Sequence, residues 1–332
     1  MALDITVKID VVKAAGKVGM GIPLILAQNA DANAEFEEVT SLPEVVSAGY
    51  AEGTDTYAAA KLIFMQNDCP AKIAVAATTG TAAEWLADEG NVSEDWRQLI
   101  VVGGESVAHN DIMAVIETLR GKMYFASLPV DDATELKVDG LERTVLFYCT
   151  DADYSCPAAA LVGATAGYEA GSFTYKNIIL KGIAAQKLSD GEITAIHKKG
   201  GITVVKKAGD IVTSEGKTAG GEYIDIIDSK DYVIQNIEYA GQKLLNENKK
   251  VRYDNRGIAM LKAVVKTCLQ NAYTNGIIAD NEDGTPAYDV VTLTRDQVSA
   301  DDRRDRIYNG CSFSFALAGA IHEAPINGQI LI

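Results

Sequence analysis

Three residues of a glycine-rich turn, Gly216-Lys217-Thr218, have the types that bind phosphate in nucleotide-binding loops. Such a loop also needs a glycine five residues before the triplet, so that backbone N–H groups can surround the phosphate. That position is Ile211. Residues 223–227 predict a strand after the turn, whereas a phosphate site needs a helix N-terminus there. The turn therefore does not predict a nucleotide site.

The histidines and cysteines lie far apart along the chain. The three histidines are His109, His197 and His322, and no GxSxG nucleophile turn accompanies them. The cysteines share neither a metal-ligand spacing nor a CxxC redox spacing: Cys69, Cys149, Cys156, Cys268 and Cys311. We predict no catalytic residue, and we interpret the cysteines as small buried side chains of a protein made in a reducing compartment.

A few glycine and acidic residues directly follow expected strands, where α/β proteins bind their ligands. The glycine pair at 103–104 lacks the GxGxxG spacing of a dinucleotide site. Asp131-Asp132 and the nearby Asp151 and Asp153 offer oxygen ligands for a divalent cation, but no third carboxylate or histidine stands at ligand spacing. We therefore expect neither a metal nor a cofactor.

The composition is that of a globular protein with an acidic surface. The 332 residues include 46 acidic and 30 basic side chains, for a net charge of −16, and 48% are hydrophobic. This charge disfavours nucleic acid and anionic membranes as partners. No apolar run approaches the roughly 18 residues of a membrane helix, and the first residues lack an apolar leader segment. We expect a cytoplasmic product with no direct membrane insertion.

Strand-like and helix-like segments alternate between residues 22 and 167. Thr81 and Glu84 form a capping box that opens one helix. Short apolar runs predict strands at 22–27, 72–76, 99–102, 123–127 and 144–148, and apolar residues at helical spacing predict helices at 57–66, 107–119 and 157–168. This order predicts an open, mainly parallel α/β sheet.

The pattern changes near Gly171, where we place a domain boundary. A strand at 172–183, a capping box of Ser189 and Glu192, and a hairpin around residues 207–209 follow. Later strands are expected at 288–294, 312–316 and 324–332. The chain is thus predicted as an N-terminal arm (1–20), an α/β domain (21–170), an α+β domain (171–322) and a C-terminal arm (323–332).

Residues 214–258, together with the helix that continues to 275, are predicted to form helices with apolar faces that pack against other elements. Apolar residues recur at helical spacing in 231–246 and again in 257–275, and Asp231 is predicted to cap the first of these helices. Basic residues gather between and along the helices of an otherwise acidic protein: Lys249, Lys250, Arg252, Lys262 and Lys266. Two interpretations stay open, namely lysines that complement a helix C-terminus and a docking patch for an acidic partner.

Both ends of the chain are predicted to form apolar strands without a partner in their own domain. Residues 3–9 alternate apolar and polar side chains and lead into a glycine-containing joint. Unpaired edges aggregate unless another chain pairs with them. We therefore predict intersubunit strand arms, formed by Leu3, Ile5, Val7, Ile9, Ile326, Ile330, Leu331 and Ile332.

The order of these turns and packing residues resembles a known family. The runs EGKTAGGEYIDIIDSKDYVIQNIEYAGQKLL and KKVRYDNRGIAML are similar to the C-terminal core of contractile tail sheath proteins from phages and phage-tail-like particles. The resemblance extends over TYKNIILKGI before them and FSFALAGAIHEAPINGQI after them. Residues 21–170, which include PLILAQNA, resemble the short, two-domain form of the family.

The resemblance implies a structural subunit and no enzyme. It implies an α/β outer domain, an α+β sheath core domain and terminal strands that pair with neighbouring subunits. Six-fold rings of the protein itself would stack around an inner tail tube, between a baseplate and a tail terminator. The sheath would contract and drive the tube through a target envelope. Such a protein is made in the bacterial host cytoplasm and assembled in the virion or tail-like particle, and the five basic residues are candidates to face the tube.

Two other classes of protein fit the sequence. One is a cytosolic α/β enzyme or ligand-binding protein with an accessory α+β domain. It would need a pocket at the strand ends near Gly103, Asp131 and Asp151. The other is a static coat that assembles without contracting.

Overall fold

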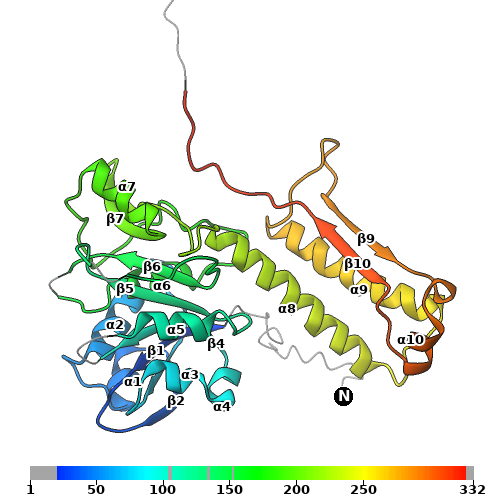
Figure 1. Cartoon of the computed structure of the whole chain (residues 1–332), viewed down its shortest axis with the longest axis horizontal. Helices are drawn as coiled ribbons and strands as arrows, with labels where there is room; N and C mark the ends of the chain where they lie inside the picture. Colours follow the sequence, from blue (N-terminus) through cyan, green and yellow to red (C-terminus); the bar gives the residue numbers. More distant parts are fainter. Residues whose placement is uncertain (1–20, 104–106, 133–134, 152, 327–332) are drawn as a thin grey trace, which may run out of the picture.

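The computed structural model describes residues 21–103, 107–132, 135–151 and 153–326. They form a body of residues 21–223, a helical extension of residues 224–315 and a C-terminal strap of residues 316–326 (Figure 1). The predicted strands at residues 3–9 and at Ile330, Leu331 and Ile332 lie outside the described residues.

The body is built on one eight-stranded sheet of order β2-β3-β1-β4-β5-β6-β7-β8. Strands β1, β3, β4, β5, β6 and β7 run parallel, and β2 and β8 join the two edges antiparallel. The strands are β1 (Ile22–Ala27), β2 (Ala34–Val39), β3 (Ile73–Ala77), β4 (Trp96–Val102), β5 (Met123–Leu128), β6 (Thr144–Tyr148), β7 (Gly201–Lys207) and β8 (Asp210–Thr213). The predicted parallel sheet is confirmed.

Helices cover both faces of this sheet because its inner strands are apolar on both sides. Leu24 and Leu26 point to one face and Ile25 to the other, and all three are fully buried. One face packs against α2 and α6, and the other packs against α3, α5 and α7. The helices are α1 (Leu42–Ser47), α2 (Asp55–Phe64), α3 (Ala82–Leu86), α4 (Glu89–Ser93), α5 (His109–Ile116), α6 (Ala158–Thr165) and α7 (Asp190–Lys198).

Local helix and turn signals behaved as the sequence predicts. The Thr81–Glu84 and Ser189–Glu192 capping boxes open α3 and α7. The turn between β7 and β8 contains Ala208 and Gly209, both with positive φ. These features are confirmed. They could be predicted because each depends on only a few neighbouring residues.

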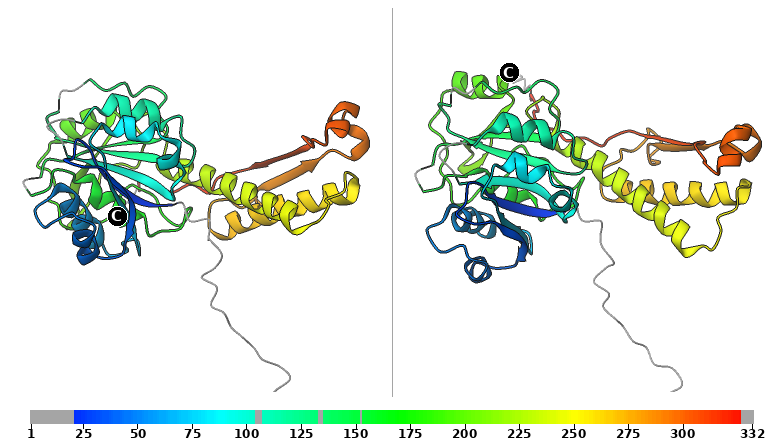
Figure 2. Two further views of the ribbon diagram at one scale, coloured as in Figure 1. Left: turned by 90° about the horizontal axis from the view of Figure 1, so that it is seen from below. Right: turned by 60° about the horizontal axis from the view of Figure 1, so that its bottom comes forward.

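The helical extension projects away from the body (Figures 1 and 2). Its two long helices pack against each other, and a two-stranded antiparallel sheet lies along α9. The elements are α8 (Ile224–Glu247), α9 (Asn255–Thr274), β9 (Tyr288–Thr292), the 3-10 helix η1 (Arg295–Gln297), α10 (Ala300–Asp305) and β10 (Cys311–Phe315). With a rise of about 1.5 Å per residue, the 24 residues of α8 span about 36 Å.

Three expectations differ from the structure. The large sheet continues beyond residue 170, because β7 pairs with β6 and β8 pairs with β7. The predicted strand at 172–183 makes only one isolated bridge, between Ile179 and Val212. Residues 224–227 begin helix α8 instead of forming a strand, since Ile224 and Ile227, three positions apart, both bury against the body.

The C-terminal strap returns from the extension to the body. Ala318 donates a backbone hydrogen bond to Ile277 at 2.9 Å, and His322 Nε2 lies 2.9 Å from Thr174 Oγ1. The His322 ring also contacts the Tyr223 ring edge to face. Within the described part of the strap, residues 324–326 are not a strand, and the side chain of Ile326 is 91% exposed.

Candidate functional site

The Gly216-Lys217-Thr218 turn is closed on itself. The N–H groups of Thr218 and Gly220 donate to the carbonyl oxygens of Glu222 and Leu141, and the Gly216 N–H donates to the Glu215 carboxylate. The Lys217 ammonium lies 4.7 Å from the centre of the Tyr223 ring. Because these donors are already used within the protein, the turn offers no cradle for a phosphate.

The three histidines are separated and each meets a hydroxyl group. His109 Nδ1 lies 2.8 Å from Tyr124 Oη, and His197 Nε2 lies 2.8 Å from Ser214 Oγ. The second contact resembles a nucleophile and its base, but Ser214 is buried and its oxygen also accepts the Thr203 N–H. Burial, outweighing the nearby Glu215, lowers the pKa of His197. The pair therefore holds α7 against the segment after β8.

The strand ends that a ligand would occupy are largely filled. Sheet order reverses between β1 and β4, and there the buried Gln28 side chain donates to the Gly103 carbonyl and accepts from the Ala82 N–H. A separate pocket near Asp151, at the ends of β5 and β6, has a volume of about 170 Å³. Ordinary ligand pockets measure about 300–1,000 Å³.

Two further kinds of site are absent from the described residues. Within them, no group of three or more His, Cys, Asp or Glu side chains is placed to hold a metal ion. Across those same ranges, no helix is both long enough and apolar enough to span a membrane.

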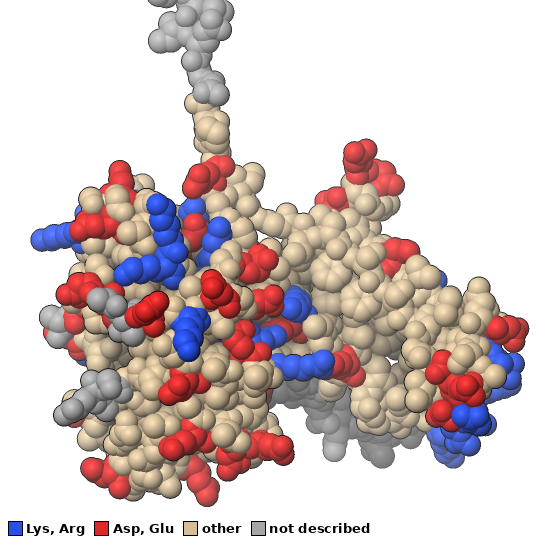
Figure 3. Space-filling view, viewed as in Figure 1, with Lys and Arg blue, Asp and Glu red and all other residues tan. Residues whose placement is uncertain are grey.

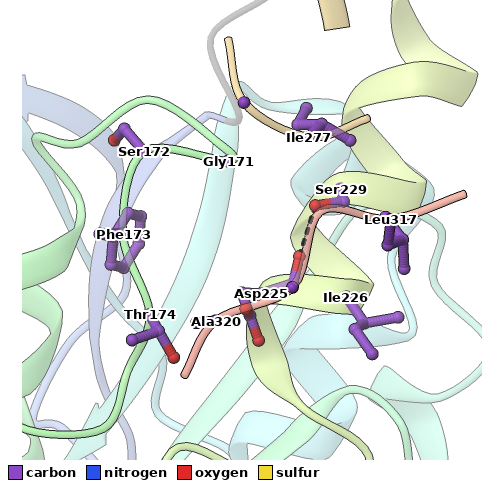
Figure 4. A pocket seen from close by; sticks show the side chains of 12 residues that line it. Gly171, Ser172, Phe173, Thr174, Asp225, Ile226, Ser229, Ile277, Leu317 and Ala320 are labelled. Atoms are coloured by element: carbon purple, nitrogen blue, oxygen red, sulfur yellow. Dashed lines mark hydrogen bonds between the residues drawn. The ribbon is translucent and has the colours of Figure 1, made fainter. Parts of the chain in front are cut away.

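A larger pocket of about 330 Å³ lies where the body, the extension and the strap meet (Figure 4). Its apolar walls include Phe173, Ile226, Ile277 and Leu317. One carboxylate oxygen of Asp225 is buried there without a hydrogen-bond partner, and burial raises its pKa. The lining includes no histidine, cysteine or lysine, so the pocket does not combine a nucleophile with a base.

A buried cluster of charges fastens α8 to the body. Arg97, on β4, is 1% exposed; one guanidinium nitrogen lies 2.8 Å from Asp231 and the other contacts Asp228. Arg143 makes two further hydrogen bonds of 2.9 Å to Asp231, and Tyr175 donates to Asp228 at 2.9 Å. The cluster satisfies both carboxylates and joins α8 to β4 and to Arg143, the residue before β6.

The charges of the cluster shift each other's pKa values. Burial alone lowers the pKa of Arg97, but Asp228 and Asp231 outweigh it and raise that pKa above its ordinary value. Burial alone raises the pKa of Asp231, but hydrogen bonds from Arg143 and the charge of Arg97 hold it below its ordinary value. At neutral pH these shifts keep Arg97 protonated and Asp231 ionised.

Sequence reasoning missed this cluster and assigned Asp231 to a helix cap. Asp231 lies inside α8 and is buried, so that prediction is wrong. Two signals could have indicated the cluster. Arg97 is the charged residue of the fully buried strand β4, and Asp228 and Asp231 stand three residues apart on one helix face.

The five basic residues divide into two groups. Lys249, Lys250 and Arg252 are exposed at the turn between α8 and α9, at the end of α8 away from the body. Lys262 and Lys266 stand one turn apart on α9, with Lys262 half-buried near Cys311 of β10. Arg252 pairs with Asp254, which caps α9.

The two-stranded sheet of the extension has open edges. In the described part of the chain, β9 and β10 pair only with each other. At the two ends of this pairing, the Leu293 N–H donates to Gly310 and the Ala316 N–H donates to Ala287. These two bonds show which residues of β10 direct their backbone groups toward β9, because alternate residues of an antiparallel strand do so. The N–H and C=O groups of Cys311, Phe313 and Phe315 consequently point away from β9, toward the outer edge of β10.

Apolar side chains are exposed around this open sheet. Ten of the 13 exposed large apolar residues of the described chain lie in the extension or the strap: Ile234, Tyr239, Leu245, Val291, Leu293, Ile307, Phe313, Leu317, Ile321 and Ile326. Exposed apolar surface beside unpaired strand edges marks a protein–protein contact.

Comparison with known proteins identifies the fold. No protein-family model matches the sequence, and no curated protein sequence matches it either. Solved structures do match. A chain in the baseplate of the anti-feeding prophage has a TM-score of 0.73 at 13% identity, over 94% of this chain and 93% of that chain.

Sheath structures match to a similar extent. The helical sheath of the anti-feeding prophage in its contracted state has a TM-score of 0.72 at 13% identity, over 94% of this chain and 93% of that one. The contracted PVC sheath complex, an extracellular contractile injection system, has a TM-score of 0.69 at 12% identity, over 94% and 91%. A sheath tail protein from Listeria innocua has a TM-score of 0.58 at 11% identity, over 81% and 88%. The resemblance predicted from the sequence is confirmed in the fold: this chain has the fold of contractile sheath proteins.

Proposed function

We propose that this chain is the structural subunit of a contractile tail sheath. Copies polymerise as stacked rings around an inner tube, and contraction of the sheath drives the tube through a target envelope. The observation that carries this proposal is the fold match, which spans 94% of the chain and 93% of a sheath chain solved in its contracted state.

The open sheet of the extension supports assembly through strand exchange. Residues 1–20 and 323–332 act as arms that pair with the β9–β10 sheet of neighbouring copies. The outward-facing backbone groups of β10 provide donors and acceptors for such a strand. Hydrogen bonds between an arm and the sheet of a neighbouring copy can persist while one copy rotates against the next, provided that the chain between arm and body can bend.

The other partners follow from the same proposal. Rings have six-fold symmetry, the inner surface meets the tail tube, and the ends of the sheath meet a baseplate and a tail terminator. The body faces outward and the extension faces inward. The assembled particle is a phage tail or a tail-like particle made in a bacterial cytoplasm.

Electron microscopy tests the proposal directly. The purified full chain, concentrated and imaged in negative stain, is expected to form rings or sheath-like tubes. A chain that stays monomeric at high concentration, with both ends intact, contradicts the proposal.

Deletion of either arm tests strand exchange. Removal of residues 1–15, or of the last eight residues, is expected to leave a folded monomer that does not polymerise. Circular dichroism and sedimentation measure folding and association in turn. Loss of folding in both truncated chains would show that the arms pack within their own chain.

Charge reversal tests the tube-facing assignment of Lys249, Lys250, Arg252, Lys262 and Lys266. Replacing them by glutamate is expected to uncouple the sheath from its tube while sheath tubes still form. If reversal blocks self-assembly instead, the patch faces a sister subunit. Reversal of the exposed Lys243, on the same extension, is the control.

A further inference from the structure

The net charge of the chain is distributed very unevenly. Residues 21–170 contain 24 acidic and seven basic side chains, whereas residues 171–332 contain 20 of each. Residues 21–170 therefore carry a net charge of −17, and residues 171–332 carry none. Identical copies with so much like charge repel one another unless oppositely charged surfaces meet.

One edge of the body is acidic. Residues 21–60, which form β1, β2, α1 and the start of α2, contain seven acidic residues and no basic residue. The exposed members on and around β2 and α1 define the acidic edge: Asp31, Glu35, Glu37, Glu38 and Glu44. On the face drawn in Figure 3, the lower part of the body shows acidic side chains without basic ones.

The opposite edge of the body is rich in lysine. Residues 176–217 contain eight lysines and four acidic residues. The exposed lysines on α7, β7 and the segments beside them define the lysine edge: Lys181, Lys187, Lys198, Lys199, Lys206 and Lys207. Figure 3 shows basic side chains gathered around α7 and β7 at the top of the body.

Sheet topology keeps the two edges far apart. Strands β2 and β8 end the sheet on opposite sides, with six strands between them. Seven spacings of about 4.8 Å place the edges about 34 Å apart. That separation exceeds the Debye length of about 8 Å at physiological salt, so the two edges of one copy hardly neutralise each other. The body is therefore an electric dipole along its sheet.

Local contacts leave several of the lysine charges available to a partner. Lys207 donates to the side-chain amide oxygen of Asn177 at 2.9 Å, Lys181 donates to the corresponding oxygen of Asn67, and Lys199 donates to a backbone carbonyl. These acceptors are neutral.

Each edge also exposes an aliphatic side chain among its charges. Val46 of α1 is 43% exposed beside the acidic edge, and Ile179 is 51% exposed where its segment covers β8. An apolar centre inside a charged rim is the composition of a specific protein–protein contact.

We propose that neighbouring copies of this chain dock edge to edge, with the lysine edge of one copy on the acidic edge of the next. The occupant is a second copy because both complementary surfaces belong to the same chain. A contact between different patches is heterologous and closes into a ring when the rotation allows it. This contact would join neighbouring subunits of the proposed sheath. The closing of such contacts into a ring rests on the proposed sheath function.

Charge exchange between the two edges tests this contact. One full-length variant carries Lys198→Glu, Lys199→Glu and Lys206→Glu, and a second carries Asp31→Lys, Glu35→Lys and Glu37→Lys. Each variant alone is expected to self-associate at least tenfold more weakly than the wild type in sedimentation velocity at low salt. An equimolar mixture of the two is expected to regain association, because every contact then joins opposite charges.

A control separates edge contacts from net charge. The variant Arg120→Glu, Lys230→Glu, Lys243→Glu changes the net charge by the same amount at exposed sites outside both edges. It is expected to associate far more strongly than the lysine-edge variant. Circular dichroism and thermal unfolding show whether each variant keeps the wild-type fold.

The outcomes separate this contact from the proposed function. Edge variants that associate like the control, a mixture that regains nothing, or a wild type without salt-sensitive association each overturn the edge contact. Tubes that persist in micrographs of both edge variants also overturn it, while the sheath function stands. Association that depends on both edges, in a wild type that never forms tubes, supports the edge contact and contradicts the sheath function.

Discussion

The body and the helical extension differ in how completely each buries its own apolar surface. The body has two core clusters, one on each face of the sheet, with 30 and 20 buried apolar residues, and only Ile224 and Ile227 among them come from α8. The extension has one cluster of eight, and Ala170 of the body is one of them. A core of that size supplies little stability on its own, so the extension depends on what it touches.

The same difference explains where the two regions meet other molecules. Inner strands of the body are covered on both sides, and the segment with Ile179 covers its β8 edge. Among the described residues, the extension leaves both edges of the β9–β10 sheet open and exposes Val291, Leu293 and Phe313. A self-sufficient region and an incomplete one, joined by a buried charge cluster, suit a subunit whose assembly contacts must change while its body stays intact.

Breaking the charge cluster is expected to have the largest effect. Replacing Arg97 by methionine leaves Asp228 and Asp231 buried with fewer partners, and breaking a buried ion pair in this way costs about 3–5 kcal/mol. Urea denaturation measures the loss in the free energy of unfolding. The matched control is Arg120→Met, since the Arg120–Glu238 pair also joins body to α8 but is exposed, and such pairs contribute about 0–1 kcal/mol. Equal losses in the two variants would contradict the role given to the cluster.

Truncating one core leucine in each region sharpens the comparison further. Leu62 in the body and Leu269 in the extension are both fully buried, and leucine-to-alanine changes of this kind cost about 2–5 kcal/mol. Hydrogen exchange is expected to show loosening confined to α8, α9 and β9 in Leu269→Ala, and faster exchange throughout the body in Leu62→Ala. Uniform loosening in both variants would mean that the two regions unfold as one unit.

Acid is expected to weaken the attachment of α8 to the body before it weakens the hydrophobic cores. The pKa of Asp231 is lower in the folded chain, so its contribution is present above its unfolded pKa of about 3.9 and is lost as the pH falls through the folded value. The variant Asp231→Asn is expected to be about 1.5–3 kcal/mol less stable than the wild type at pH 7. Denaturation at several pH values should show this gap narrowing below about pH 4. A gap that stays constant with pH would contradict the charge-based account.

Much of the body could be predicted from the sequence because its rules are local. Near-continuous apolar strands separated by helices specify a buried parallel sheet, and the Thr81 and Ser189 caps mark helix starts by themselves. The attachment of β7 and β8 to that sheet could not be predicted, since β6 and β7 pair across more than 50 residues. A composition change at Gly171 therefore suggested a boundary where the sheet continues.

The junction was harder to predict for a different reason. In residues 223–227, apolar and polar side chains alternate enough to suggest a strand. The helix is favoured by the burial of Ile224 and Ile227 against the body and by the ion pair between Asp228 and Arg97. Each of these contacts joins residues far apart in sequence. The predicted intersubunit arms and tube-facing lysines stay predictions, because they concern surfaces that only a second molecule completes.

The smallest effect on the isolated chain is expected on the open sheet. Val291 and Leu293 lie two residues apart along the same chain segment, so their side chains point to one side, and both are substantially exposed. Replacing both by serine shortens two side chains that are 52% and 40% exposed, and surface changes usually alter the free energy of unfolding by about 0.5 kcal/mol or less. Assembly should nevertheless weaken, because a neighbouring copy that covers this surface loses apolar contact area.

Thermal unfolding and sedimentation measure the two effects separately, and Asp289→Ser, in the same strand, is the control that removes a charge and no apolar side chain. If the double serine variant destabilises the monomer strongly and leaves assembly unchanged, the two side chains belong to the core of the extension, and the contrast between a complete body and an incomplete extension fails at this surface.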